Sequence, residues 1–194
     1  MNTATFLPIH SERLLLRAFE PADRPAYDAY HSRPEVYRFL YMPVPVGAAL
    51  DKQFAAALST RIEENGDTLR LAVVRRDDSA LLGEVLLKVE NKAGLQGEVG
   101  YIFNPDFAGA GYATEAVGMM VDVGFSRIGF HRIFARLDPL NAGSVGVVER
   151  LHFRREAHLL QNDRFNGAWG DEFIYALLKA EWDARTKKCQ QRPA

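Results

Sequence analysis

The segment Asn104–Ala116, with the sequence NPDFAGAGYATEA, combines residue types that suit an anion-binding loop. Gly109 and Gly111 permit a tight turn and a close backbone approach to a ligand, because glycine carries no Cβ. The segment follows an expected strand and leads directly into an expected helix, whose first turn has unpaired N–H groups and the positive end of the helix dipole. This combination predicts a site for a phosphate or a diphosphate, and a plain tight turn is the structural alternative.

Two common nucleotide-binding patterns do not match this loop. The dinucleotide-binding pattern needs a third small residue where Thr114 stands, and its strand normally opens the fold, whereas three expected strands precede this one. A Walker loop ends in Gly-Lys, but Gly111 is followed here by Tyr112, so no lysine reaches a phosphate. An enzyme that uses a nucleotide is therefore a remote alternative.

The elements around the loop must position it, and periodicity and turn residues predict where they lie. Apolar residues recur at every fourth position of Val46–Glu64, which favours an amphipathic helix. The other expected helices are Pro21–Ser32, Pro34–Phe39, Ala113–Ile128 (with Gly129 just beyond its end) and Ala142–Leu151. The expected strands are Leu14–Leu16, Leu69–Val74, Leu81–Val89, Glu98–Phe103, Arg132–Leu137, Phe153–Leu160 and Glu172–Leu178, the last two joined by a turn at Asn166-Gly167.

The order of these elements predicts an α/β fold with a mixed sheet. Short turns join the strands between Leu69 and Phe103 into an antiparallel meander. The strand–helix–strand order of Glu98–Leu137 then implies a right-handed crossover between two parallel strands. The sheet should therefore be antiparallel early in the chain and parallel in its middle.

Four segments carry a resemblance to a known family: Leu14–Arg17, Glu98–Tyr101, Gly109–Ala116, and Asn141-x-x-Ser144 followed by Leu151-x-Phe153. In this order they resemble the GNAT superfamily of N-acetyltransferases, and within it the RimJ/RimL-like ribosomal-protein N-terminal acetyltransferases. The resemblance runs from about Ser11 to Trp182. The glycine loop together with the later motif is far more specific than the loop alone.

The resemblance implies a strongly twisted mixed sheet of about seven strands with flanking helices, in which Glu98–Phe103 and Arg132–Leu137 are parallel neighbours that splay apart. It also implies acetyl-CoA as co-substrate and no metal. The pantetheine arm would lie in the wedge as an added strand would, beside Tyr101, Ile102 and Phe103. The remaining residues implied to bind the cofactor are Ala108, Gly109, Ala110, Gly111, Tyr112, Ala113 and Thr114 at the diphosphate, and Asn141 and Ser144 near the pantetheine.

The implied reaction is the transfer of an acetyl group to a primary amine, either a protein N-terminal α-amine or a small-molecule amine, by direct attack on the thioester. An alkyl amine has a pKa of about 10 and an α-amine one of about 8, so the site needs a proton acceptor at pH 7. Glu98 stands at the position of the family's frequent base, and a surface carboxylate is its structural alternative. Glu84 on the neighbouring strand is a second candidate for the same role.

The oxyanion of the intermediate is expected to be bound by a backbone amide near Phe103. Many family members protonate the leaving thiolate with a tyrosine, but that position holds Val148 here. Ser144 is the nearest hydroxyl on the same helix and becomes the second catalytic candidate, with a role at the helix start as its alternative.

Two further positions depart from the family pattern. The first loop position, usually Gln or Arg, is Asp106, so its carboxylate must point away, cap the helix or be offset by a cation. His152 replaces the glycine before the final phenylalanine. The chain's histidines show no metal-ligand spacing, so a metal role for His152 is not favoured.

The acceptor amine is expected to bind between Pro21–Met42 and Asn162–Gly170, which flank the wedge in the family. Aromatic walls with few charges suit a peptide N-terminus or an amine with an apolar body, although such residues also serve as core or as a dimer contact. The aromatic residues of these two segments include Tyr27, Tyr30, Tyr37, Tyr41, Phe165 and Trp169.

Composition limits the remaining possibilities. The chain has 194 residues, with 24 Lys and Arg against 25 Asp and Glu, which favours a single domain over residues 1–184 followed by a polar basic tail that frays over residues 185–194. A formal net charge of -1 argues against nucleic-acid binding, and no apolar run is long enough for a membrane span. The single cysteine, Cys189, excludes a disulfide framework and fits the cytoplasm.

The sequence is compatible with both a monomer and a homodimer. Val148 and Asp106 also keep a second class of function open, a catalytically weak acyl-CoA-binding sensor or interaction module. Release of CoA in the presence of amines separates this module from an enzyme.

Overall fold

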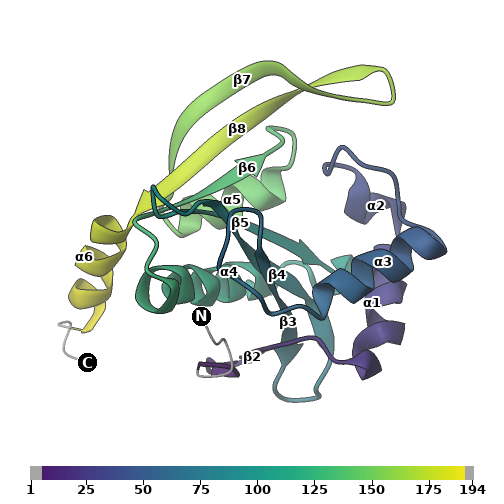
Figure 1. Cartoon of the computed structure of the whole chain (residues 1–194), viewed down its shortest axis with the longest axis horizontal. Helices are drawn as coiled ribbons and strands as arrows, with labels where there is room; N and C mark the ends of the chain where they lie inside the picture. Colours follow the sequence, from purple (N-terminus) through teal and green to yellow (C-terminus); the bar gives the residue numbers. More distant parts are fainter. Residues whose placement is uncertain (1–5, 191–194) are drawn as a thin grey trace.

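The computed structural model describes residues 6–190, which form one eight-stranded sheet with helices on both of its faces (Figure 1). The order of the strands across the sheet is β1-β2-β3-β4-β5-β6-β8-β7. The strands are β1 (Ile9–His10), β2 (Leu14–Arg17), β3 (Thr68–Arg75), β4 (Leu81–Asn91), β5 (Gln96–Phe103), β6 (Arg132–Leu137), β7 (Arg154–Phe165) and β8 (Ala168–Leu178). The expected mixed α/β fold is confirmed, and the two-residue β1 is the strand that the sequence did not indicate.

The parallel pair at the centre of the sheet is joined over only part of its length. β5 and β6 pair at Gln96–Glu98 and Arg132–Phe134, and the register ends there. The rest of β5, Val99–Phe103, keeps its antiparallel partner β4 but has no pairing to β6. The predicted splay between the two strands is therefore confirmed, and one edge of β5 lies open beyond Glu98.

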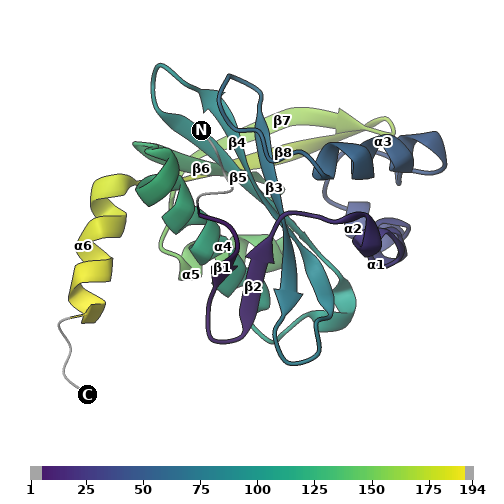
Figure 2. The ribbon, with the colours of Figure 1, turned by 60° about the horizontal axis from the view of Figure 1, so that its bottom comes forward.

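The helices divide between the two faces of the sheet (Figure 2). One face is covered by α4 (Tyr112–Val123) and α5 (Ala142–Arg150), and the other by α1 (Arg24–His31) and α3 (Ala48–Ala57). Strand β5 alternates between the two cores as expected, because Val99 and Tyr101 pack on the α4 side and Ile102 packs on the α1 side. The remaining helices are η2 (Pro21–Asp23), α2 (Pro34–Tyr37), η3 (Pro105–Phe107), η4 (Gly124–Ile128) and α6 (Lys179–Gln190).

The helix expected over Val46–Glu64 is shorter than its apolar pattern suggested. α3 ends at Ala57, with Leu58 as its C-cap. Ile62 is buried, but it packs into the α4-side core, while Leu50 and Phe54 pack on the α1 side. The fourth apolar residue of the stripe therefore serves a different core, and the chain has to leave the helix to reach it.

The crossover from β5 to β6 follows the expectation closely. The predicted helix Ala113–Ile128 is α4 followed by one π-helical turn, η4, at Gly124–Ile128. Gly129 ends it with a φ of 87°, the left-handed conformation that glycine adopts most easily.

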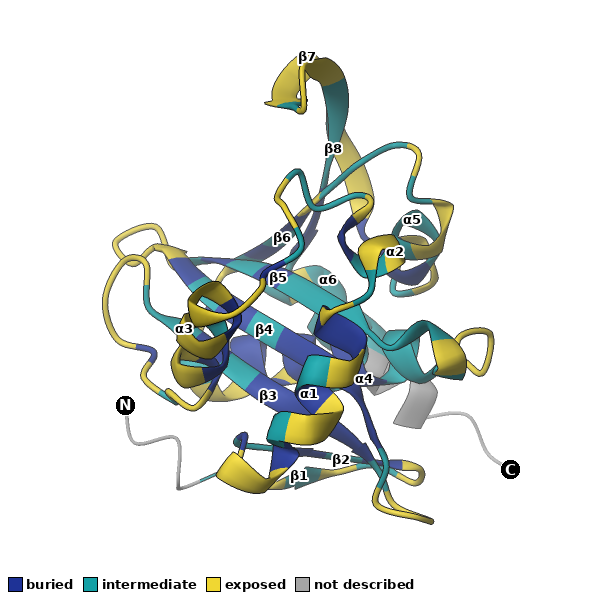
Figure 3. Cartoon of the chain, turned by 90° about the vertical axis from the view of Figure 1, so that its right-hand side faces the viewer, coloured by how far each residue is buried: buried dark blue, intermediate teal, exposed yellow. Residues whose placement is uncertain are grey.

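The β7–β8 hairpin is longer than predicted and extends away from the body of the molecule, where its tip is exposed (Figure 3). Asn166 and Gly167 form its turn, with φ values of 51° and 83°. The helix α6 continues to Gln190 and so includes residues 185–190 of the expected tail, while residues 191–194 lie outside the described part. Within residues 6–190, no helix combines the length and the apolar character needed to cross a membrane.

Candidate active site

The glycine loop connects the open end of β5 to the first turn of α4. Gly109 and Gly111 both adopt left-handed backbone conformations, with φ values of 83° and 80°. A Cβ atom built on Gly109 has no neighbour within 4 Å, so this backbone faces open space, and one on Gly111 lies 3.7 Å from Arg13 Nη2. Both glycines are thus required by conformation, and Gly109 leaves room for a ligand beside the chain.

The backbone amides of this loop are largely free. The Ala108 amide bonds to Pro105 O at 3.0 Å, and the next one with a protein partner is that of Glu115, which bonds to Gly111 O at 3.1 Å. Between them, Gly109–Thr114 have no hydrogen bond from their N–H groups to any residue in the described range 6–190, and the N-cap Gly111 offers no side chain. Of the predicted diphosphate residues, Gly109 through Thr114 keep free donors, whereas the Ala108 amide is used inside the loop.

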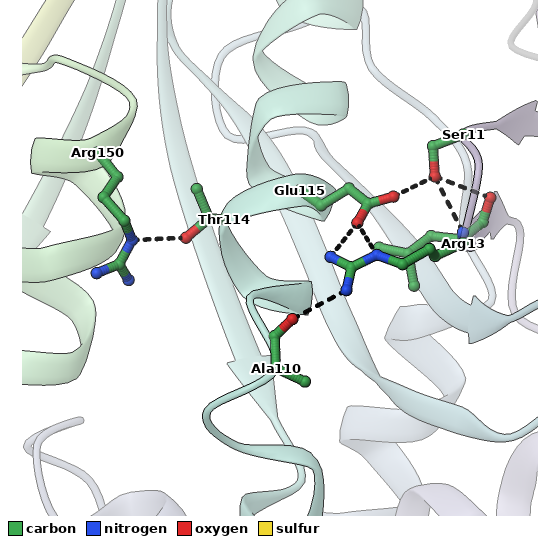
Figure 4. A network of polar contacts seen from close by, with 7 residues as sticks. Ser11, Arg13, Ala110, Thr114, Glu115 and Arg150 are labelled. Atoms are coloured by element: carbon green, nitrogen blue, oxygen red, sulfur yellow. Dashed lines mark hydrogen bonds and ion pairs between the residues drawn. The ribbon is translucent and has the colours of Figure 1, made fainter.

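Two arginines lie on opposite sides of the start of α4 (Figure 4). Arg13 from the β2 side donates to Ala110 O at 3.0 Å and to the Glu115 carboxylate, and its guanidinium lies 4.8 Å from the centre of the Tyr112 ring. Arg150 from α5 donates to Thr114 Oγ1 at 3.1 Å. Neither residue gave a signal in the sequence, and both hold the loop in place and bring positive charge close to its free amides.

Glu115 completes the attachment on the Arg13 side. Its carboxylate accepts a hydrogen bond of 2.6 Å from Ser11 Oγ and one of 2.8 Å from Arg13 Nε. Partial burial acts to raise the pKa of Glu115, but the hydrogen bonds from Ser11 and Arg13 outweigh it and hold that pKa below its usual value. The first turn of α4 is therefore tied to β2 through an ionised side chain.

The negative charge of Asp106 is compensated by an arginine. Arg33 Nη1 donates to Asp106 Oδ1 at 2.7 Å and to Asn104 Oδ1 at 3.1 Å. Of the three alternatives considered for this carboxylate, the structure therefore contains the nearby cation. His152 has a φ of 65°, so it occupies the left-handed conformation for which its family counterpart is a glycine.

The wedge between β5 and β6 is bounded by α5. Tyr101 Oη donates to the Ser144 carbonyl oxygen at 2.9 Å, and burial raises the pKa of Tyr101, so its hydroxyl stays protonated. The predicted cofactor residues Ile102 and Phe103 continue along the unpaired stretch of β5. The strand edge, the loop and the start of α5 are thus brought together as expected.

Asn141 and Ser144 both lie at the start of α5. Asn141 is the N-cap, and its Oδ1 accepts a hydrogen bond of 3.1 Å from the Ser144 amide, the usual capping geometry. Ser144 is the third residue of the helix, and Val148 one turn further on is fully buried in the core. The roles of Asn141 at the pantetheine and of Ser144 as thiolate donor stay predictions.

Glu98 is the last residue of β5 that pairs with β6, and the two strands diverge beyond it. Arg136 donates to both of its carboxylate oxygens, at 2.9 and 3.0 Å, and Lys88 Nζ lies 4.0 Å away. Both carboxylate oxygens of Glu98 are therefore already engaged by one guanidinium, in the bidentate geometry that arginine favours. The role of Glu98 as base stays a prediction, and any such role involves Arg136, which is bound to the same carboxylate.

Glu84, the second candidate base, is fully buried on β4 opposite Ile102. One of its oxygens is paired with Arg70, and the other, Oε2, has no hydrogen-bond partner within the described residues. Glu84 therefore lies directly behind the open stretch of β5, one strand away from the wedge.

Two cavities lie where the acceptor was expected. The first, about 410 Å³, is lined by Arg38 and Tyr41 after α2, by residues 138–140 after β6 and by residues 165 and 168–171 of the β7–β8 hairpin. The second, about 260 Å³, shares Arg38 and Phe165 with the first and is also lined by Tyr37. Tyr37, Tyr41, Phe165 and Trp169 are therefore cavity walls, whereas Tyr27 and Tyr30 are fully buried, so the alternative of a core role holds for these two.

Tyr41 connects the three walls of the larger cavity. Its hydroxyl donates to Asp138 Oδ2 at 2.7 Å, and a Cβ atom on Gly170 would lie 2.0 Å from that hydroxyl oxygen. Burial and the neighbouring Asp138 raise the pKa of Tyr41. Tyr41 also has a φ of 50°, a strained backbone for a residue with a side chain, which its contacts stabilise. Asp138 gave no signal in the sequence, because only the fold brings it to this cavity.

No set of three or more His, Cys, Asp or Glu side chains suitable for a metal ion occurs within residues 6–190. The arrangement offers instead free amides for a diphosphate, an open strand edge beside them and an acceptor cavity beyond. Such a combination suits a group transfer from a phosphate-bearing carrier to a small acceptor.

Comparisons with known proteins agree with this chemistry. Residues 13–154 match the family model of the acetyltransferase (GNAT) domain, so the chain belongs to that family and is an N-acetyltransferase. The uncharacterized N-acetyltransferase YnaD of Bacillus subtilis is 30% identical over 175 residues, which cover 90% of this chain and 99% of YnaD. The expected superfamily and enzyme class are confirmed.

Two solved structures share the fold over most of the chain. A GNAT-family acetyltransferase from Bacillus anthracis is 27% identical, with a TM-score of 0.78 over 90% of this chain and 100% of its own. The spermidine N-acetyltransferase from Vibrio cholerae, solved with CoA and spermine, is 20% identical, with a TM-score of 0.77 over 89% of this chain and 99% of its own. At that identity the second structure shows the fold alone.

Proposed function

We propose that this protein uses acetyl-CoA to acetylate a primary amine, either a protein N-terminal α-amine or the amine of a small molecule. The observation that carries the proposal is the run of free amides at Gly109–Thr114, next to the unpaired edge of β5. The free amides suit a diphosphate, and the strand edge suits an extended amide-containing arm. GNAT-family membership supplies the acetyl donor that joins these two groups.

The residues proposed to hold the donor follow from this geometry. The amides of Gly109–Thr114 bind the diphosphate, and Arg13 and Arg150 fix the loop from either side. Tyr101, Ile102 and Phe103 hold the arm along the strand edge, and their backbone polarises the thioester carbonyl through an amide near Phe103. When bound, acetyl-CoA supplies an activated acetyl group. The residues of the chain orient it toward the acceptor cavity.

The acceptor is proposed to enter through the cavities lined by Tyr37, Tyr41, Phe165 and Trp169. Aromatic walls favour the apolar body of a peptide or an amine, and at the larger cavity Asp138 and Asp171 outnumber Arg38, which favours a positive charge. A related enzyme acts on spermidine, so a polyamine belongs in the same test as an N-terminal peptide. Glu98 or Glu84 accepts the proton that the amine loses, and Ser144 donates one to the leaving thiolate.

A thiol-release assay tests the proposal. The purified protein is mixed with acetyl-CoA and with peptides of different N-termini, polyamines and simple primary amines, and free CoA thiol is measured. We expect release that depends on both the protein and one class of amine, above the hydrolysis seen without an amine. CoA binding without release for any amine would contradict the proposal and favour the sensor or interaction module instead.

The role of Glu98 is tested by Glu98→Gln. As base, Glu98 should matter most at low pH, where less of the amine is unprotonated, so the variant should lose activity mainly there. The measurement is the pH dependence of kcat/KM, with Arg136→Gln as a companion that frees the carboxylate. A pH profile of Glu98→Gln identical to that of the wild type would remove Glu98 from the role.

A further inference from the structure

The α1 side of the sheet contains a fully buried group of polar side chains that the proposed function does not use. The buried side-chain atoms without a hydrogen-bond partner, among the described residues, are four: Tyr27 Oη, Tyr30 Oη, His31 Nε2 and Glu84 Oε2. His31 and Glu84 are both fully buried, and the Tyr27 and His31 ring centres lie 3.9 Å apart. The Tyr30 and His31 ring centres lie 4.4 Å apart, and His31 Nε2 lies 3.6 Å from Glu84 Oε2, so the four residues form one cluster. Helix α1 packs on β4 there, and Figure 3 shows α1 in front of the sheet.

The other ring nitrogen of His31, Nδ1, contacts a residue of the acceptor side. Its Nδ1 lies 2.5 Å from Tyr37 Oη, and Tyr37 also lines the 260 Å³ cavity. Gln53 Nε2, which can only donate, lies 3.0 Å from both His31 Nδ1 and Tyr37 Oη. Because a donor faces Nδ1, that nitrogen carries the lone pair, and the ring proton is on Nε2.

The Nε2–H tautomer directs the proton of His31 toward Glu84. Nε2 and Glu84 Oε2 are 3.6 Å apart, each without another partner, while Arg70 occupies the second oxygen of Glu84. A second proton, received at Nδ1, converts the ring to imidazolium and turns these two unpaired atoms into an ion pair. The cluster is therefore built to gain a favourable contact when His31 accepts a proton.

The charged and titratable groups around His31 agree with this direction. Glu84 from β4 and Arg70 from β3 offset each other, so one further positive charge is added to a neutral pair. Burial and the charge of Glu84 raise the pKa of Tyr27 and Tyr30 on α1, and burial raises that of Tyr37 on α2. The three tyrosines therefore stay neutral, and His31 is the member of the cluster whose ring can take up a second proton and release it again.

We propose that Tyr37, His31 and Glu84 form a proton relay that removes the proton lost by the acceptor amine. The relay rests on the proposed function and makes Glu84 the buried end of the base, which acts through His31. The neutral amine forms its bond to the thioester carbon while the C–S bond breaks. The amine proton passes to Tyr37 Oη as the Tyr37 hydroxyl proton passes to His31 Nδ1.

The proton that the relay takes up is returned to the cavity through Tyr37. The leaving thiolate takes a proton from water or from Ser144, and the proton held on His31 returns through Tyr37 to neutralise the base so formed. Tyr37 is the member that lines the cavity, while His31 and Glu84 are positioning residues that act through it. Glu84 also lies opposite Ile102 on the open stretch of β5, so the relay ends next to the expected thioester position.

The kinetic test compares Tyr37→Phe and His31→Gln with the matched control Tyr30→Phe, which removes an unpaired hydroxyl from the same cluster. The acceptor is whichever peptide or amine the wild type acetylates fastest. We expect the first two variants to lose about 100-fold in kcat, the scale of one general-base contribution, and the acid limb of the pH profile to disappear in His31→Gln. Tyr30→Phe should stay within about twofold of the wild type.

Unchanged kcat and an unchanged acid limb in Tyr37→Phe or His31→Gln would overturn the relay, while absence of CoA release by the wild type would overturn the proposed function instead. A second measurement does not require the variants to fold. The ¹⁵N chemical shifts of the histidine rings in the wild-type protein assign the tautomer of His31. We expect the proton on Nε2, and a neutral ring with its proton on Nδ1 would overturn the relay because that nitrogen could then accept nothing.

Discussion

The proposed cofactor side and the proposed acceptor side of this enzyme are built in different ways. The cofactor side is one contiguous stretch, strand β5, the glycine loop and the start of α4, joined within about twenty residues of chain. The acceptor side gathers α2 with the segment after it, the segment after β6 and the β7–β8 hairpin, which are far apart in the sequence. Local backbone conformation therefore determines the first, and long-range packing determines the second.

A charged residue in the glycine loop of the cofactor side should give the largest effect, a loss of CoA affinity. In Gly109→Asp, a carboxylate would stand beside the bound diphosphate, and like charges about 4 Å apart repel by several kcal/mol at an effective dielectric constant of about 20. We expect the Kd for CoA, measured by calorimetry, to rise at least about 100-fold.

Two variants separate charge from backbone strain. Gly109→Asn is nearly the same size, is neutral and tolerates a positive φ, so it should weaken CoA much less. Gly66→Asp places the same charge at another open glycine with a φ of 89°, away from the loop, and should leave the Kd unchanged. Equal losses in all three variants would show that the loop does not bind the diphosphate.

Breaking the acceptor side should affect a different constant. The methyl group of Gly170→Ala would displace Tyr41, whose hydroxyl oxygen lies 2.0 Å from the new Cβ position. We expect kcat/KM for the acceptor to fall on the order of 10-fold, since misplaced substrate contacts are costly, while the Kd for CoA stays within about twofold.

Tyr41→Phe is the milder companion to this variant, because it removes only the hydrogen bond to Asp138. It should show a smaller loss in the same constant. A matching loss of CoA affinity in Gly170→Ala would mean that the two sides are not independent.

The smallest effect is expected where the two sides meet. Arg33 precedes α2 and neutralises Asp106 beside the loop, so Arg33→Ala should weaken CoA about fivefold by leaving that carboxylate unpaired. The double variant Arg33→Ala/Asp106→Asn should restore the affinity. Calorimetry at low salt and at about 1 M salt, where the Debye length is about 3 Å, checks the electrostatic origin, because the difference should vanish at high salt.

The sequence predicted the backbone elements of the proposed cofactor side, although not the contacts of Arg13 and Arg150 with the loop. The glycines, the strand before them and the helix after them carry their own local signals, and Gly129 ends the crossover helix where it was expected to. The splay of β5 and β6 came from the family resemblance, because no local pattern says where two parallel strands stop pairing. The ends of α3 were misjudged since Ile62 packs in the other core.

The acceptor side could be predicted only as a pair of segments. Tyr27 and Tyr37 look alike in the sequence, yet one lies in the core and the other lines a cavity, a difference set by the packing of α1 on β4. The pairing of Glu98 with Arg136 and of His31 with Glu84 joins residues more than 35 positions apart. Such contacts exist only once the sheet has formed, so composition and spacing cannot predict them.

A crystal structure of the protein with CoA bound tests the central claim most directly. We predict diphosphate oxygens within hydrogen-bond distance of the amides between Gly109 and Thr114, and the thiol end of the arm beside Tyr101–Phe103 in the opening between β5 and β6. CoA bound elsewhere, with those amides still unbonded and the opening filled by protein side chains, would contradict it.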